Sequence, residues 1–135
     1  MHQKSRKLVA KKYVGNDEIV VIPDGIETIS PRAFENCESI RSIVISESVK
    51  TIGCAAFYKC INLESVRIPS SVKKLGSSAF AECEKLRAVV FEGEVPWYNC
   101  DPLVFLKCPN LIIYAAKDNY IKRYAENNKI SFVAI

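Results

Sequence analysis

Apolar residues return along most of this chain at a fixed interval of 23 positions. One set with this spacing is Ile22, Ile45, Ile68 and Phe91. The dipeptide Ala-Phe, with a cysteine three residues after the phenylalanine, recurs in the same register within residues 33–37, 56–60 and 79–83. A repeat of 23 residues is typical of solenoids, because repeats built from pairs of helices need about 33 residues or more. Since one copy cannot cover its own apolar side, the copies are expected to stack.

Each copy predicts a strand, a bend and a helical segment. Residues 63–69 (LESVRIP) alternate apolar and polar side chains and stop at proline, as a short strand does. Val72 and Leu75 continue the inward-facing stripe across a turn, and Gly76 supplies the bend. Residues 77–83 (SSAFAEC) open with hydroxyl side chains and space Phe80 and Cys83 by three, which predicts about two turns of helix.

The two ends of the array depart from the repeat. Residues 13–18 predict a turn after an incomplete first coil, and the fourth copy carries an insertion around residues 94–98. Asp118 is expected to cap a helix over 119–128, and residues 131–135 are expected to add a final strand. The predicted organisation is a basic leader (1–12), one domain (13–135), repeats at about 20–42, 43–65, 66–88 and 89–114, and a C-terminal cap (115–135).

The three regular copies read IPDGIETISPRAFENCESIRSI, ISESVKTIGCAAFYKCINLESV and IPSSVKKLGSSAFAECEKLRAV. Their shared pattern, I-P-x-x-V-x-x-[IL]-G-x-x-A-F-x-x-C-x-x-L-x-x-[IV], resembles the BspA-like class of bacterial leucine-rich repeats over about residues 19–114. The resemblance implies an α/β solenoid, a short right-handed array of about four 23-residue coils closed by a C-terminal helix and strand. It also implies a surface adhesin or protein-binding module, since members of the class are often of that kind.

Charge and hydropathy narrow the function classes further. The net charge of +4 arises in residues 1–12, which sum to +5, while the remainder sums to −1. The leader is interpreted either as a solvated tail or as a contact for phosphate or anionic lipid, and no nucleic-acid partner is expected. No apolar run approaches the about 20 residues of a membrane span, and the leader has no apolar stretch of signal-peptide length. The chain as given is therefore expected in the cytoplasm, whereas the resembled class is often secreted or at the cell surface.

The side chains available for chemistry are few, because the one histidine is His2. No cysteine pair has C-x-x-C spacing, and the glycines form no phosphate-binding loop. We therefore expect no enzyme, no catalytic residue, no metal site and no cofactor. Four cysteines fall at core positions and are predicted to be buried, reduced thiols: Cys37, Cys60, Cys83 and Cys108. Cys54, at the turn, is predicted to be more exposed, and Cys100, at a core position, to be buried.

The candidate binding surface is the strand face that points away from the core. Its first predicted row is Ile19, Ser42, Ser65, Ala88 and Ile113, and its second is Val21, Val44, Arg67, Val90 and Ala115. The residues assigned to a protein-binding site are Val21, Ser42, Val44, Ser65, Arg67, Ala88, Val90 and, from the insertion, Trp97.

Two interpretations of this face stay open. Exposed apolar patches often mark contacts, but β-branched residues also simply favour strands. Trp97 is interpreted either as a binding hot spot or as a plug over the last coil. The alternative function is a structural stacking unit or a self-associating fragment of a longer surface repeat protein.

Overall fold

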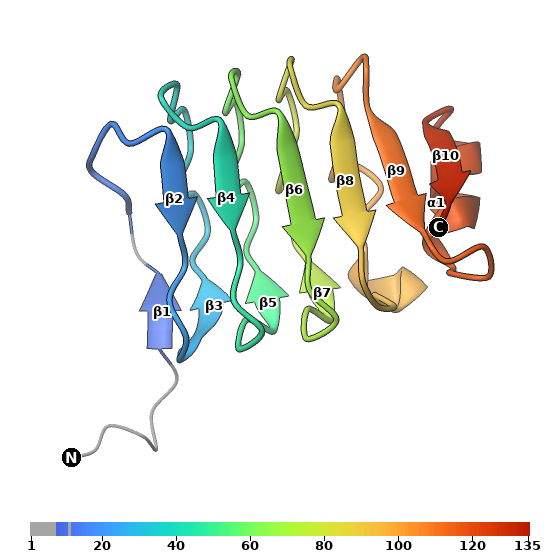
Figure 1. The fold of residues 1–135 in the computed structure, drawn as a ribbon, viewed down its shortest axis with the longest axis horizontal. Helices are drawn as coiled ribbons and strands as arrows, with labels where there is room; N and C mark the ends of the chain where they lie inside the picture. The colour runs from blue at the N-terminus through green and yellow to red at the C-terminus, as the bar shows by residue number, and fades with distance from the viewer. Residues whose placement is uncertain (1–7, 11) are drawn as a thin grey trace.

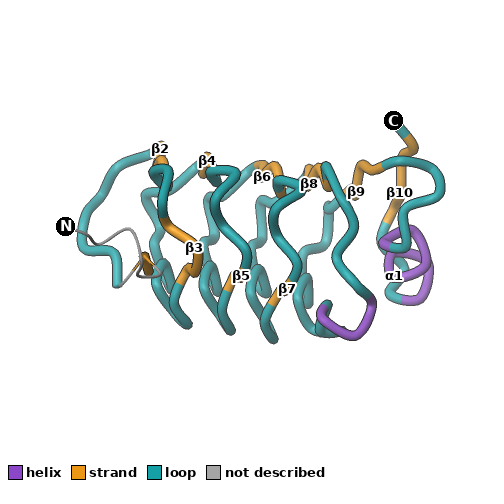
Figure 2. The backbone as a smooth tube through the Cα atoms, turned by 90° about the horizontal axis from the view of Figure 1, so that it is seen from below, coloured by secondary structure: helices purple, strands orange, loops and turns teal. Residues whose placement is uncertain are grey.

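Successive copies of the repeat form successive coils of a β-solenoid of about five turns (Figure 1). The structure is a computed structural model and describes residues 8–10 and 12–135. Six strands form a parallel sheet along one side: β2 (Ile19–Val21), β4 (Ser42–Val44), β6 (Ser65–Ile68), β8 (Ala88–Phe91), β9 (Ile112–Ala115) and β10 (Ser131–Ala134). Four shorter strands form a second parallel sheet: β1 (Leu8–Ala10), β3 (Ile26–Ile29), β5 (Thr51–Ile52) and β7 (Lys74–Leu75). Figure 2 shows the coils side by side, with the short helix α1 (Ile121–Asn127) beside β10 at the C-terminal end.

The 23-residue period sets the register of both sheets. Ile43 of β4 pairs with Val66 of β6, and Ile52 of β5 pairs with Leu75 of β7. Because equivalent residues lie directly over one another, each repeated apolar position becomes a continuous line through the core. The predicted stacking of coils is confirmed.

The repeated phenylalanine forms an aromatic stack along the solenoid. The rings of Phe34, Phe57 and Phe80 lie nearly parallel, with centroids 5.1 and 4.9 Å apart. Tyr13 extends the stack at the N-terminal end at 5.3 Å, and Phe105 extends it at the other end at 5.7 Å. Burial of aromatic rings is among the largest single contributions to a small core, so this stack holds neighbouring coils together.

The repeated cysteine forms a second line. The Sγ–H of Cys60 donates to the carbonyl of Phe34 at 3.0 Å, and Cys83 donates in the same way to Phe57 at 3.2 Å. Cys108 repeats the contact with Phe80 at 3.1 Å. A thiol fits this position because it is small and apolar enough for the core yet satisfies a carbonyl of the preceding coil. All six cysteines are free, and the burial predicted for Cys60, Cys83 and Cys108 is confirmed.

The predictions for the other three cysteines are confirmed in part. Cys54 is exposed, as predicted. Cys37 is only half-buried; it lies in the first complete coil, and its thiol contacts Glu35 of the same coil. Cys100 is also half-buried; it pairs with Leu75 in an isolated parallel bridge, so the core position assigned to it is correct.

The helical segment predicted for each copy is wrong. Residues 77–83 form consecutive turns, in which Ala79 N–H donates to Gly76 and Ala81 N–H donates to Ser78. These bonds span three residues, and alternate with bonds to the next coil, so no α-helical ladder can form. Ser78 and Glu82 have positive φ angles of 60° and 58°, which ends any helical run.

The C-terminal cap follows the prediction in outline. A helix and a final strand are present, but the helix covers 121–127. The cap residue is Tyr120 and not Asp118, and the side chain that bonds the first residue of the helix is that of Asn119, whose Oδ1 accepts the Ile121 N–H at 3.0 Å. The Asn119 amide also donates to Gly93 at 2.9 Å, so a buried polar side chain ties the cap to the insertion.

Both ends of the hydrophobic core are covered. The inward residues of the first complete coil, such as Val20 and Ile29, are buried, and so are Leu111 and Ile113 of the last. Tyr13 packs against the core at one end, and Tyr124 and Phe132 pack against it at the other. The solenoid therefore shields its core within the described chain. Among the described residues, no helix has the length and apolar character needed to cross a bilayer.

Candidate functional site

The outer face of the six-stranded sheet, meaning the face turned away from the core, carries the predicted binding residues. Here every second residue of a strand points outward. Three apolar side chains at its N-terminal end are largely exposed: Ile19 (63%), Val21 (62%) and Val44 (52%). These residues lie on two neighbouring strands, since Val21 pairs with Val44 in the register of β2 and β4. They form one contiguous apolar patch in contact with solvent.

The remaining predicted residues continue this face toward the C-terminus. Ser65 and Arg67 of β6 are exposed, and Ala88 and Val90 of β8 are half-buried. Ser42 of β4 is also half-buried. In register, Arg67 lies between Val44 and Val90, so the structure brings these side chains to one surface as the period predicted.

Arg67 is the one charge on the outward positions of β2, β4, β6 and β8. Its Nη1 lies 2.7 Å from Oε2 of Glu92, which directly follows the C-terminal end of β8. This ion pair is exposed to solvent, so it fixes the orientation of the guanidinium more than it stabilises the fold. The arginine therefore presents a held cationic group beside the apolar patch.

The N-terminal ends of the strands carry a line of charges that alternate in sign. Arg41 lies 3.8 Å from Glu18 and 3.6 Å from Glu64, and Arg87 lies 3.5 Å from the other oxygen of Glu64. Each coil supplies one member of this line at the same repeat position. Because the signs alternate, the charges pair among themselves and the line carries little net charge.

Two residues assigned to the outer face are in fact buried. Ile113 and Ala115 point into the core, and Ile112 and Tyr114 take the outward positions of β9. The register explains the error, since Ala88 pairs with Ile112 and Val90 pairs with Tyr114. The spacing between inward residues shrinks from three, as between Ile40 and Ile43, to two, as between Leu111 and Ile113.

This shift adds residues that the sequence prediction missed. Tyr114 and, from β10, Val133 extend the row that begins at Val21. The sequence carries no alternation that marks the shift, because residues 111–115 (LIIYA) are all apolar. Trp97 belongs to the short 3-10 helix η2 (Trp97–Asn99), in the insertion and away from the sheet. Its side chain lies outside the described ones, so neither interpretation of it is tested.

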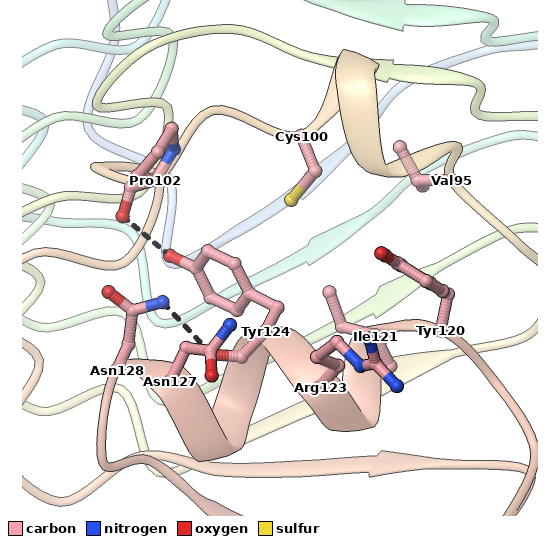
Figure 3. Close-up of a pocket in the computed structure, with 9 residues that line it drawn as sticks. All are labelled: Val95, Cys100, Pro102, Tyr120, Ile121, Arg123, Tyr124, Asn127 and Asn128. Atoms are coloured by element: carbon pink, nitrogen blue, oxygen red, sulfur yellow. Dashed lines mark hydrogen bonds between the residues drawn. The ribbon is translucent and has the colours of Figure 1, made fainter.

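A cavity of about 360 Å³ lies between the insertion and α1 and was not predicted (Figure 3). Val95 and Cys100 line it from the insertion, and Tyr120, Ile121 and Tyr124 line it from the cap. The Tyr124 hydroxyl donates to the carbonyl of Pro102 at 2.9 Å, which joins the two walls. We name this hollow the cap cavity.

The electrostatics of the cap cavity disfavour nucleophilic chemistry. Burial, together with the nearby charge of Asp101, raises the pKa of Cys100 to about 12. Burial likewise raises the pKa of the Tyr124 hydroxyl. Both groups keep their protons near neutral pH, and a protonated thiol is a poor nucleophile. Within the described part of the chain, no group of three or more His, Cys, Asp or Glu side chains is placed to hold a metal ion.

The comparisons with known proteins agree with this architecture. A family model described as BspA type leucine-rich repeat region matches residues 12–131 in six copies. No curated protein matches the chain. A leucine-rich repeat protein from Eubacterium ventriosum superposes with a TM-score of 0.71 at 24% identity, covering 94% of this chain and 36% of its own.

Two further solved structures show the same fold. A leucine-rich cell surface protein from Faecalibacterium prausnitzii gives a TM-score of 0.62 at 24% identity, covering 88% of this chain and 43% of its own. The pneumococcal vaccine antigen PcpA gives 0.64 at 17% identity, covering 87% and 36%. This chain therefore spans less than half the length of each of the three.

Proposed function

The chain belongs to the BspA-type leucine-rich repeat family, and from this we propose that it is a non-enzymatic protein-binding module that uses the outer face of its six-stranded sheet. Leucine-rich repeat domains typically mediate protein interactions. The single observation that supports the proposal most is the exposed apolar patch of Ile19, Val21 and Val44 on adjacent strands. The solvent-facing side of a sheet normally carries polar side chains. An apolar patch there is therefore typical of a surface that binds a partner.

The proposed contact has an apolar centre and one held cation. Val44, Arg67 and Val90 lie side by side in register, with the Arg67 guanidinium fixed by Glu92. A partner surface that suits this arrangement offers apolar side chains and one hydrogen-bond acceptor near the arginine. The line of paired charges at the N-terminal ends of the strands would form a polar rim, as interfaces commonly have. Its members are Glu18, Arg41, Glu64 and Arg87.

The absence of catalysis is part of this proposal. It is supported by the raised pKa values of the buried thiols and by the location of the one histidine at residue 2, outside the described residues. The finer architecture is also proposed: a right-handed array with about four 23-residue coils and additional capping turns. A cell-surface role, as in the F. prausnitzii relative, is a further proposal.

The experiment is a binding assay with matched surface variants. The wild-type chain and Val21→Glu/Val44→Glu would be used to retain partners from the surroundings of the source organism, identified by mass spectrometry. Leu103→Glu/Leu106→Glu is the control, since it alters two exposed apolar residues in the turn segment of the last coil. The proposal expects a partner, identified and then purified, that the wild type and the control bind and the outer-face variant does not. Equal binding by all three would contradict it.

A second candidate is self-association, which the open edges of the sheet support. β2 and β10 end the six-stranded sheet, so each has an unpaired edge among the described residues, and Ile135 beside β10 is exposed. Exposed edge strands are templates for pairing with another chain. Light scattering over a range of concentrations separates the candidates, because oligomers that grow with concentration favour self-association and a strict monomer favours a separate partner.

A further inference from the structure

The turn side of the solenoid contains a ladder of backbone hydrogen bonds that all run in one direction. In the first complete coil, three N–H groups donate to carbonyls of the next coil. These pairs are Arg32 to Cys54 (2.9 Å), Phe34 to Ala56 (2.7 Å) and Asn36 to Tyr58 (2.8 Å). The residues between them bond locally, as Ala33 N–H does to Ser30. In residues 32–36, each N–H that bonds another coil therefore points toward the C-terminal end.

The same ladder recurs in the following coils. The next set is Ala55 to Ser77 (2.9 Å), Phe57 to Ala79 (2.7 Å) and Lys59 to Ala81 (3.0 Å), followed by Phe80 to Val104 (2.9 Å) and Glu82 to Leu106 (2.7 Å). Positive φ angles at the outer members of each set, such as 56° at Ala55 and 59° at Lys59, make this possible. Every second N–H group of these segments is thereby left to bond outside its own coil.

At the last coil this ladder has no further coil to bond. The equivalent donors are Leu103, Phe105 and Lys107. Asp101 Oδ1 accepts the Leu103 N–H at 2.8 Å. The Phe105 N–H faces the hydroxyl oxygen of Tyr124, whose own hydrogen is donated to Pro102. For the Lys107 N–H, the described chain supplies no acceptor. Lys107 nevertheless keeps the positive φ, 59°, that orients the group outward along the ladder.

The surroundings of this open donor are cationic. A cavity of about 310 Å³ lies beside it, and its otherwise largely apolar lining includes Lys107, Lys129 and Asn128. No acidic residue lines this cavity. Neither lysine takes part in an ion pair within the described residues. Two lysines without an ion pair and an N–H without an acceptor thus belong to one concave surface, whose charge suits an anion.

We propose that the C-terminal end of the turn ladder is an oxyanion-binding site, in which the Lys107 N–H and the ammonium groups of Lys107 and Lys129 hold a carboxylate or phosphate oxygen. The chain itself places a carboxylate, that of Asp101, on the first of the three terminal donors. An external oxyanion would supply the corresponding acceptor for the third. This site lies on the turn side, so it is separate from the outer face proposed for protein binding.

The test is a titration of the full ¹⁵N-labelled chain with inorganic phosphate, and separately with acetate, at constant ionic strength. The Lys107 amide signal is expected to move in a saturable way with at least one probe, because an acceptor completes its hydrogen bond. Lys59 provides a matched internal control: it has the same repeat position and the same φ, but its N–H is bonded to Ala81. Its amide signal is expected to stay in place.

Variants complete the experiment. Lys129→Gln and Lys107→Gln are each expected to weaken anion binding about two- to fivefold, the range of an exposed ion pair, while Lys59→Gln leaves it unchanged. Saturation with phosphate alone would assign a phosphate group, and comparable saturation with acetate a carboxylate. The proposal is overturned if Lys107 does not respond to either probe, or if Lys59 and Lys107 respond alike, which would indicate an adventitious ion only.

Discussion

The middle coils and the ends of the solenoid use the same repeat with different results. In the middle, Phe57 has a stacked ring on each side, at 5.1 and 4.9 Å. At the C-terminal end, Phe105 has one stacked neighbour at 5.7 Å, and Phe91 and Tyr124 contact it edge-on at 6.3 and 6.1 Å. A coil with a neighbour on each side packs against equivalent residues of the repeat. The end coil also packs against residues outside the repeat, such as Tyr124.

This difference also locates the unusual surface groups. In the middle coils, the donors of the turn ladder bond carbonyls in the next coil, with the exception of the Ser78 N–H. At the C-terminal end, the insertion and α1 leave the cap cavity and the open Lys107 N–H. The repeat therefore builds the core, and the departures from it decide which chemical groups face a ligand.

The largest expected effect is the loss of a middle ring. Phe57→Ala should lower the free energy of unfolding by about 3–5 kcal/mol, since the side chain is fully buried. Phe105→Ala should cost about 1 kcal/mol less, because an end coil has a neighbouring coil on one side only and can collapse more readily into the space left behind. Urea unfolding of both variants measures the difference. A larger loss for Phe105 would reverse the ranking of the middle and the end.

The next effect comes from a close approach between coils. A Cβ on Gly76 would lie 2.5 Å from the Cys54 backbone nitrogen, so Gly76→Ala must displace a neighbouring coil and should cost about 1–3 kcal/mol. At the N-terminal end, the Cβ of Gly15→Ala would meet the Tyr13 hydroxyl and ring, which can move aside. We expect less than about 1 kcal/mol there by thermal unfolding. Equal costs would show that the ends are packed as rigidly as the middle.

These contrasts also explain how far the sequence could predict the fold. The 23-residue spacing was sufficient for the buried faces of β4, β6 and β8, because each inward residue there stands over its equivalent. It failed at Ile113 and Ala115, where the chain after Leu111 is one residue shorter than the repeat. A change of one residue in a strand exchanges its two faces.

Other features were beyond the sequence for physical reasons. The segments at Thr51–Ile52 and Lys74–Leu75 are too short to show alternation, so the second sheet was not predicted. The turn segments carry helix-compatible residues, and bonds to the next coil override that preference. The cap cavity depends on how the insertion meets α1, a tertiary contact that no local pattern encodes.

A smaller effect concerns the pH dependence of the thiols. Burial raises the pKa of Cys60 to about 12 from an ordinary value of 9.0. The folded state therefore retains this proton more strongly, and the stability it contributes is complete below pH 9 and falls as pH rises toward 12. Wild type should lose about 1 kcal/mol more than Cys60→Ala between pH 9 and pH 10. Parallel urea curves at the two pH values would contradict this.

The smallest expected effect is at the exposed charge line. Glu64→Ala removes contacts of 3.6 and 3.5 Å with Arg41 and Arg87, yet it should change the free energy of unfolding by less than about 0.5 kcal/mol. Added salt should reduce the change further. A loss comparable to that of Phe57→Ala would mean that the inward and outward positions are misassigned.

Equivalent residues of successive coils line one shielded core. Thiol labelling of the native protein, followed by peptide mass spectrometry, tests this most directly. Cys54 is exposed, whereas Cys60 and Cys83 are buried and bonded to the preceding coil. We expect Cys54 to label first, and Cys60 and Cys83 to label only when the protein unfolds. Labelling of native Cys60 as fast as Cys54 would contradict it.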